Sequence, residues 1–223
     1  MLYVIATPIG NLEDITFRAI SALNSSDLIL AEDTRVTRVL LSKYGIDKPM
    51  LSYHQHSRVK KINEIIKLLK EGKTLSLVSD AGTPGINDPG NFLIQEILKE
   101  LLDLKIVPIP GPNAAIAALS VSGFPADKFV FLGFPPHKKG RQTFFKKIGE
   151  MEETVVFYES KHRILKALQE LVEISEIGTR PIIVARELTK QFETIYRGTV
   201  NEVLEKLNKT KILGEFVVVI RAK

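Results

Sequence analysis

The segment SDAGTPGINDPG at residues 79–90 decides the fold class. It follows the apolar run TLSLV at residues 74–78, which is typical of a buried strand, and precedes apolar residues at helical spacing over 93–101. Strand, loop and helix in this order form the repeating unit of an α/β sheet, whose ligands bind beyond the carboxyl ends of the strands. A loop this long and this rich in glycine and proline predicts a functional site, because simple connections are shorter.

The composition of this loop predicts its local structure. Gly82 and Gly85 let the main chain adopt a positive φ or approach a ligand closely. Asp88 and Pro89 predict an N-cap followed by the first turn of the next helix. The whole chain contains neither G-x-G-x-x-G nor G-x-x-x-x-G-K-[ST], which disfavours a standard dinucleotide site and a P-loop ATPase.

Strand and helix patterns alternate along the chain. The expected strands are 2–6, 28–31, 50–53, 74–78, 105–109, 129–134, 154–158, 182–185, 193–197 and 216–220. The expected helices are 15–24, 34–44, 62–69, 93–101, 113–119, a basic helix after Gly140, 164–172 and 200–207. This alternation predicts an α/β fold with largely parallel pairing. Because the strands are too many for one compact unit, we predict two α/β domains, 1–112 and 113–223, with a ligand cleft between them.

Composition limits the function classes. The 223 residues include 31 Lys plus Arg against 26 Asp plus Glu, a formal net charge of +5, which favours a polyanionic partner. The sequence has no cysteine, which excludes disulfides, thiolate zinc sites, iron–sulfur clusters and a cysteine nucleophile. Its apolar stretches are too short for a membrane span, and its N-terminus resembles a strand rather than a signal peptide, so we expect a cytoplasmic protein.

Polar or turn-forming motifs follow other expected strands. TPIGNLED at residues 7–14 and PGP at 110–112 are turns or ligand walls, and ARELTK at 185–190 is a salt-bridged loop or a cleft wall. In EDTR at 32–35, two acidic residues and an arginine follow directly after an expected strand. Helix capping within this segment, with a structural ion pair to its arginine, explains it as well as a catalytic role does.

Two basic stretches differ in what they predict. Residues 137–149 hold five Lys or Arg and no acid, which suits either phosphate contacts or a solvated helix face. Residues 54–61 read HQHSRVKK. Their two histidines lack companions for a metal site, so no metal is expected.

Taken in order, these motifs resemble the small-subunit ribosomal RNA methyltransferases of the tetrapyrrole methylase superfamily, over about residues 2–221. The resemblance implies two α/β domains with the methyl donor S-adenosylmethionine in the cleft between them, and no metal. It implies 2′-O-methylation of a cytidine ribose in the decoding region of 16S ribosomal RNA. The substrate would be naked RNA or the assembled small subunit, and the enzyme a homodimer.

The resemblance also implies site residues at matching positions. The donor-binding set is Pro8, Asp80, Ala81, Gly82, Thr83, Pro84, Ile86, Pro110, Gly111, Leu132, Tyr158, Ala185 and Arg186. Asp33 and Glu187 are candidate bases for the proton of the attacking hydroxyl, with Arg35 orienting a carboxylate or holding a phosphate. The expected RNA contacts are Lys138, Lys139, Arg141 and Lys190.

Two other functions stay open at this point. The superfamily also contains methylases of corrin or porphyrin precursors, although the motifs at residues 7–11 and 32–35 look like the RNA branch. A non-catalytic RNA-binding module is the other alternative. The glycines at 82, 85 and 111 argue against a lost donor site.

Overall fold

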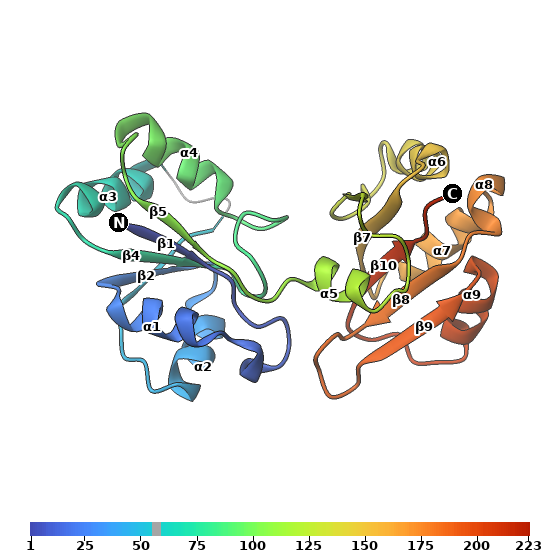
Figure 1. Cartoon of the computed structure of the whole chain (residues 1–223), viewed down its shortest axis with the longest axis horizontal. Coiled ribbons are helices and arrows are strands. Elements are labelled where there is room, and N and C mark those ends of the chain that lie inside the picture. Colours follow the sequence, from blue (N-terminus) through green and yellow to red (C-terminus); the bar gives the residue numbers. More distant parts are fainter. Residues whose placement is uncertain (55–58) are drawn as a thin grey trace. The chain divides into compact units, whose positions relative to one another are not determined.

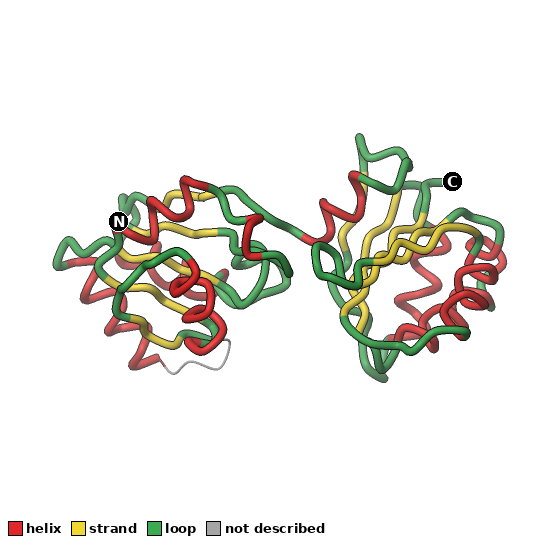
Figure 2. The backbone as a smooth tube through the Cα atoms, turned by 90° about the horizontal axis from the view of Figure 1, so that it is seen from below, coloured by secondary structure: helices red, strands yellow, loops and turns green. Residues whose placement is uncertain are grey.

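The computed structural model describes residues 1–54 and 59–223. They form two compact units, Met1–Asn113 and Ala114–Lys223, each built on its own five-stranded sheet (Figures 1 and 2). His56 and half of the basic stretch at 54–61 lie outside the described residues, so the expectation about metal there stays a prediction. Within the described residues, no helix is long and apolar enough to cross a membrane.

The sheet of the first unit is parallel throughout, in the order β3-β2-β4-β1-β5. Its strands are β1 (Leu2–Ile5), β2 (Leu28–Ala31), β3 (Met50–Ser52), β4 (Leu75–Val78) and β5 (Ile106–Ile109). Parallel strands end at the same edge of a sheet. The segments that follow β1, β2, β4 and β5 therefore lie together at its carboxyl edge, where α/β proteins bind ligands.

Helices cover both faces of this sheet (Figure 1). The apolar sides of α1 (Phe17–Ser25) and α2 (Thr34–Lys43) pack on one face, after the short 3-10 helix η1 (Leu12–Asp14). Those of α3 (Val59–Lys70) and α4 (Asn91–Glu100) pack on the other. Strand side chains alternate accordingly: in β1, Leu2 joins the core under α3 and α4, and Ile5 joins the core under α1 and α2.

The start of α4 differs from the sequence-based expectation. The helix begins at Asn91, and its N-cap is Gly90 at φ 148° without a side-chain hydrogen bond, so the predicted Asp88 cap is wrong. The loop folds back on itself before the helix starts. Asn91 Nδ2 donates to the Gly85 carbonyl at 2.8 Å, and a Cβ on Gly90 would lie 3.2 Å from Gly85 N. This close approach delays the helix.

The sheet of the second unit has the order β6-β7-β10-β8-β9. Its strands are β6 (Phe129–Phe131), β7 (Thr154–Ser160), β8 (Ile182–Arg186), β9 (Thr194–Gly198) and β10 (Glu215–Ile220). β6 and β7 are parallel, whereas β7–β10, β10–β8 and β8–β9 are antiparallel. The expectation of largely parallel pairing is wrong here. Residues 187–193 form a connection between β8 and β9 that is too short for a parallel crossover, and β10 enters the sheet antiparallel to both β7 and β8.

The helices of the second unit are unevenly divided between the faces of its sheet (Figure 2). One face packs against α6 (Arg141–Glu150), α7 (Ile164–Val172), α8 (Ser175–Gly178) and α9 (Val200–Asn208). The other face packs against α5 (Ala114–Ser120). Along β10, Phe216 and Val218 point to the larger group and Val217 points to α5.

Candidate functional site

The glycine-rich loop is joined to the end of β1 at the carboxyl edge of the first sheet. The Thr7 and Gly82 main chains form an antiparallel bridge, and the Thr7 hydroxyl donates to the Ser79 carbonyl at 3.1 Å. Thr83 Oγ1 donates to the Pro112 carbonyl at 3.3 Å, which links the same loop to the segment after β5. The exits of β1, β4 and β5 are thus held as one structure.

The predicted donor residues of the first unit gather at this edge. Gly82 has φ +82°, and a Cβ on Gly111 would lie only 3.1 Å from the Ala6 Cβ. Both positions therefore favour glycine, one for its dihedral angle and one for close approach. The others at this edge are Pro8, Asp80, Ala81, Thr83, Pro84, Ile86 and Pro110.

Acidic side chains link the exits of β2 and β4. Asp80 Oδ1 accepts the main-chain N–H of Asp33 at 2.9 Å, and Glu32 Oε2 accepts that of Asp80 at 3.4 Å. Burial raises the pKa of Glu32 and of Asp80. Burial, with the charges of Glu32 and Asp80 adding to it, raises the pKa of Asp88 to about 6. This edge therefore carries partly desolvated negative charge, which favours a cationic ligand.

Asp33 is engaged in its own helix. It is the N-cap of α2, where Oδ1 accepts the N–H of Arg35 at 2.8 Å, and it pairs with the Arg35 guanidinium at 2.6 Å. These hydrogen bonds lower the pKa of Asp33 to about 2. The capping interpretation of this segment is confirmed, and Asp33 is a weak base in this arrangement.

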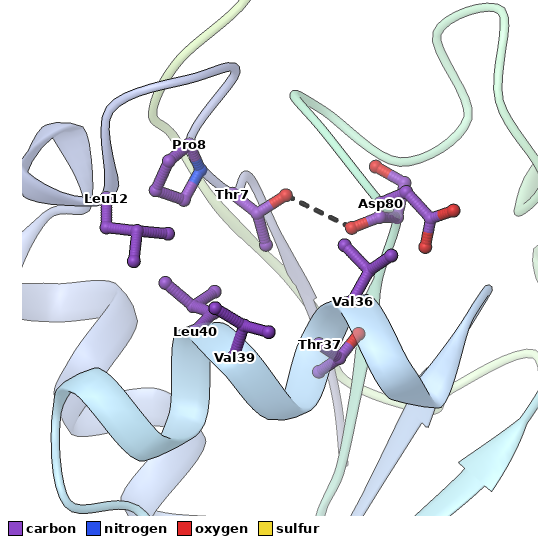
Figure 3. Close-up of a pocket in the computed structure, with 9 residues that line it drawn as sticks. Thr7, Pro8, Leu12, Val36, Thr37, Val39, Leu40 and Asp80 are labelled. Atoms are coloured by element: carbon purple, nitrogen blue, oxygen red, sulfur yellow. Dashed lines mark hydrogen bonds between the residues drawn. The ribbon is translucent and has the colours of Figure 1, made fainter. Parts of the chain in front are cut away.

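A pocket of ≈ 230 Å³ opens between the exit of β1 and helix α2 (Figure 3). Its walls are mainly apolar, and Asp80 lies across from Leu12, Val39 and Leu40. We call it the α2 pocket. Its full lining is Thr7, Pro8, Leu12, Val36, Thr37, Val39, Leu40, Ser79 and Asp80.

Thr37 is an unusual member of that lining. The residue is 3% exposed, and among the described residues its hydroxyl has no hydrogen-bond partner. Leaving a buried hydroxyl unpaired costs about 1–3 kcal/mol, so a sequence selected for stability alone would favour valine here. No sequence signal marks this residue, because a threonine inside an amphipathic helix is ordinary.

The second unit brings two of the predicted donor residues into one row. Tyr158 in β7 and Ala185 in β8 are both opposite Val217 of β10, and the three share the face covered by α5. The Tyr158 hydroxyl accepts the N–H of Ala115 at 3.2 Å. Leu132 differs, because its side chain packs against the core on the opposite face.

The end of β8 is a strained turn held by ion pairs. Glu187 and Thr189 have φ of 51° and 64°, which is uncommon for residues with side chains. Glu187 Oε1 accepts from Lys190 Nζ at 2.9 Å and from Glu215 N at 3.0 Å. Burial acts to raise the pKa of Glu187, but these hydrogen bonds outweigh it and the pKa is lowered. Arg186 Nε donates to the Leu213 carbonyl at 2.9 Å.

Lys190, one of the predicted RNA contacts, is paired with Glu187 and Glu215. The other predicted RNA contacts fall into two groups. Lys138 and Lys139 are exposed, and Lys138 lines a pocket of ≈ 360 Å³ at the start of α6. Arg141 is 4% exposed and binds Glu159 at 3.2 Å and Glu170 at 2.7 Å. Arg141 is therefore placed to support this segment rather than to reach an RNA phosphate. Glu159, the buried carboxylate that holds it, lies near the end of β7.

Comparison with known proteins places this architecture in a family. The model for Tetrapyrrole (Corrin/Porphyrin) Methylases matches residues 1–204. The chain belongs to the tetrapyrrole methylase family. It is 48% identical over 222 residues to the Thermotoga maritima protein named Ribosomal RNA small subunit methyltransferase I, covering 100% of this chain and 98% of the relative. Proteins of the same name from Bacillus subtilis and Escherichia coli O157:H7 are 46% and 44% identical, covering 99% and 98% of this chain and 74% and 77% of theirs.

Solved structures of the family agree on the fold. A cobalt precorrin-4 methyltransferase superposes with a TM-score of 0.70 at 19% identity, covering 99% of this chain and 94% of that one. A diphthine synthase gives 0.71 at 14% identity, covering 99% and 89%. Proteins with different titles thus share one architecture, and the fold alone does not identify the substrate.

Proposed function

We propose that this chain transfers a methyl group from S-adenosylmethionine to small-subunit ribosomal RNA. One observation carries the proposal: the 48% identity with a ribosomal RNA small subunit methyltransferase I, which extends over the whole chain. A tetrapyrrole substrate has weaker support, because the corrin methylase compared above is 19% identical and shares the fold alone.

The first unit fits the donor that tetrapyrrole methylases use. S-adenosylmethionine carries a sulfonium cation and an ammonium group, and Glu32, Asp80 and Asp88 supply partly buried negative charge at the carboxyl edge. The positive φ at residue 82 favours glycine, so no side chain covers the main chain at that position. Pro8, the loop from Asp80 to Ile86, Pro110 and Gly111 would hold the donor.

The donor supplies an already activated methyl group, so this chain has to position the acceptor and take up one proton. Positioning alone is worth about 7–11 kcal/mol in favourable cases. Asp33 and Glu187 remain proposed bases, but each would have to give up its present hydrogen bonds. Asp88 is hydrogen-bonded to Ser79, which lines the α2 pocket. Its pKa, raised to about 6, also suits proton uptake near neutral pH, so Asp88 joins them as a candidate.

Single-turnover methylation by Asp33→Asn, Glu187→Gln and Asp88→Asn variants tests these assignments. The variant that loses the rate at every pH while keeping donor affinity identifies the base. A wild-type rate in all three would eliminate every one of them.

The finer features follow from the family resemblance. We propose a cytidine 2′-hydroxyl in the decoding region as the target, a homodimer as the active form and the cytoplasm as the compartment.

To test the overall reaction, the protein is incubated with methyl-labelled donor and small subunits that lack the modification, with large subunits as the matched control. Label confined to small-subunit RNA is expected, and equal label in both subunits would contradict the proposal.

A further inference from the structure

We propose that the α2 pocket binds the nucleobase of the RNA nucleotide that is methylated, and that it selects a pyrimidine of the cytosine type. The inference rests on the proposed function and adds to it a specific place for the base. Two features of the first unit point to it: where the pocket lies, and which polar groups it contains.

The pocket adjoins the predicted donor loop without being part of it. Pro8 and Asp80 belong to both sets, whereas the rest of the predicted donor residues of the first unit do not line the pocket. A ligand in the α2 pocket would therefore lie beside the donor. A methyl acceptor must occupy such a place, because its attacking oxygen has to reach the donor in line with the methyl group.

The size of the pocket suits one ring. Its ≈ 230 Å³ is below the roughly 300–1,000 Å³ of sites that enclose drug-sized ligands. S-adenosylmethionine, a nucleoside with an attached amino acid, needs a site of that larger volume, whereas a single pyrimidine base needs less. Enzymes that do chemistry on a base take it out of the stack into such a pocket, and an enzyme that methylates the ribose can hold the base of the same nucleotide in this way.

The chemistry of the lining matches a base and excludes a phosphate. Pro8, Val39 and Leu40 offer apolar surface for the faces of a ring. Among the residues that the structure describes, the lining contains no lysine or arginine, and its one charged group is the carboxylate of Asp80, which would repel a phosphate.

Between the two pyrimidines of RNA, the polar groups of the pocket favour cytosine. A carboxylate accepts from the exocyclic amino group of cytosine, which uracil lacks. Asp80 uses Oδ1 for the N–H of Asp33, and a carboxylate has further acceptor positions. The Thr37 hydroxyl, unpaired among the described residues, can donate to a ring carbonyl after rotation of its side chain. A bound base would thus supply the partner that this buried hydroxyl lacks.

The test combines one protein change with one substrate change. Thr37→Val removes the hydroxyl and keeps the shape, and Ser42→Ala on the exposed last turn of α2 is the matched control. The substrates are two RNAs that share the mapped target ribose, one with cytosine and one without a base at that position. For wild-type enzyme, we expect removal of the base to lower kcat/KM by about 10-fold or more.

With the cytosine substrate, Thr37→Val should lower kcat/KM by about 5-fold, the value of one neutral hydrogen bond, whereas with the abasic substrate it should have no effect. Ser42→Ala should match wild type on both. An equal loss on both substrates, or no loss on either, would overturn the inference. Val39→Phe, which adds a ring to the pocket wall, should likewise act on the cytosine substrate alone.

A donor-binding measurement tests whether the α2 pocket holds the methyl donor instead of the base. Calorimetry with S-adenosylmethionine should give Thr37→Val and wild type the same Kd within about twofold. A loss of donor affinity equal to the loss of kcat/KM would assign the pocket to the donor and overturn the inference. Failure of wild-type enzyme to methylate small-subunit RNA would instead refute the proposed function, which distinguishes the two failures.

Discussion

The main chains of Thr7 and Gly82 exchange two hydrogen bonds: Thr7 N–H donates to Gly82 O at 2.8 Å, and Gly82 N–H donates to Thr7 O at 3.0 Å. This pair joins the end of β1 to the glycine-rich loop after β4. The loop is therefore fixed to the sheet twice, covalently at β4 and by these hydrogen bonds at the end of β1. It presents its main chain in one conformation. Preorganisation of this kind reduces the entropy lost when a ligand binds.

Replacing Gly82 should disturb this pairing without a steric clash. A Cβ at Gly82 would meet Ile9 Cγ2 at an ordinary 3.5 Å, so the cost arises from the φ of +82°. We expect Gly82→Ala to lower the free energy of unfolding by about 1–2 kcal/mol and to weaken donor binding about tenfold, or about 1.4 kcal/mol. Urea denaturation and calorimetry measure the two effects.

Gly72 is the matched control for this substitution. It lies in the turn between α3 and β4 and has nearly the same φ, +81°, and a Cβ added there would have no described atom within 4 Å. Gly72→Ala should cost similar stability and leave donor affinity unchanged. If both variants lost donor affinity equally, the special role of Gly82 would be refuted.

Asp88 should make stability depend on pH. Its pKa in the folded protein is about 6, against an ordinary value of 3.8, so folding favours the protonated form. This contribution to stability is fully present below about pH 4 and is lost as the pH rises through 6. Asp88→Asn should therefore raise the free energy of unfolding by about 1 kcal/mol at pH 8, after allowance for solvent screening, and by almost nothing at pH 4.

Urea denaturation across this pH range tests the Asp88 prediction. Asp103→Asn removes an exposed carboxylate from the turn after α4 and serves as the control. A stability difference between Asp88→Asn and wild type that does not vary with pH would contradict the account.

The buried Glu159 should matter more to stability than any surface ion pair. Its carboxylate is 1% exposed and pairs with Arg141 at 3.2 Å and Arg163 at 3.0 Å. Glu159→Gln keeps the shape but removes a buried negative charge that two arginines share, and it leaves Arg141 with Glu170 as its remaining carboxylate partner. We therefore expect a loss of about 3 kcal/mol in thermal or urea unfolding. Glu100→Gln breaks the exposed 2.6 Å pair with Lys70 and should cost about 0–1 kcal/mol; equal costs would refute the argument.

Lys138 and Lys139 should contribute to RNA affinity through phosphates. Each phosphate contact to single-stranded RNA adds about 0.7 to the slope of log K against log salt. The double variant Lys138→Gln, Lys139→Gln should therefore reduce that slope by about 1.4, measured by fluorescence anisotropy at several salt concentrations. The double variant Lys209→Gln, Lys211→Gln removes the same charge from exposed positions elsewhere in the second unit. Equal slopes for the two variants would contradict a localised phosphate site.

Much of the fold could be predicted from the sequence because its signals are local. Apolar runs place β2 at Leu28–Ala31 and α7 at Ile164–Val172, as expected from the residues alone. Strand pairing is not local. The short connection at residues 187–193 indicates the antiparallel pairing of β8 with β9. The entry of β10 between β7 and β8 depends on contacts between segments far apart in the chain, and no local pattern indicates it.

The candidate site likewise has parts that the sequence indicates and parts that form only on folding. The glycine-rich loop is visible in the sequence because its residue types are unusual and lie consecutively. The α2 pocket is not, because it combines Thr37 and Leu40 of one helix with Pro8 and Asp80 from two strand exits. The same holds for Asp88, whose pKa depends on burial and on Glu32 and Asp80, and these partners meet only after folding.

Analysis of the methylated nucleoside tests the central claim most directly. Small-subunit RNA labelled by this protein with methyl-labelled S-adenosylmethionine is digested to nucleosides and separated by chromatography with mass detection. We expect the label in 2′-O-methylcytidine and none in base-methylated nucleosides. Label on a base, or no label in RNA when the protein binds the donor, would contradict it.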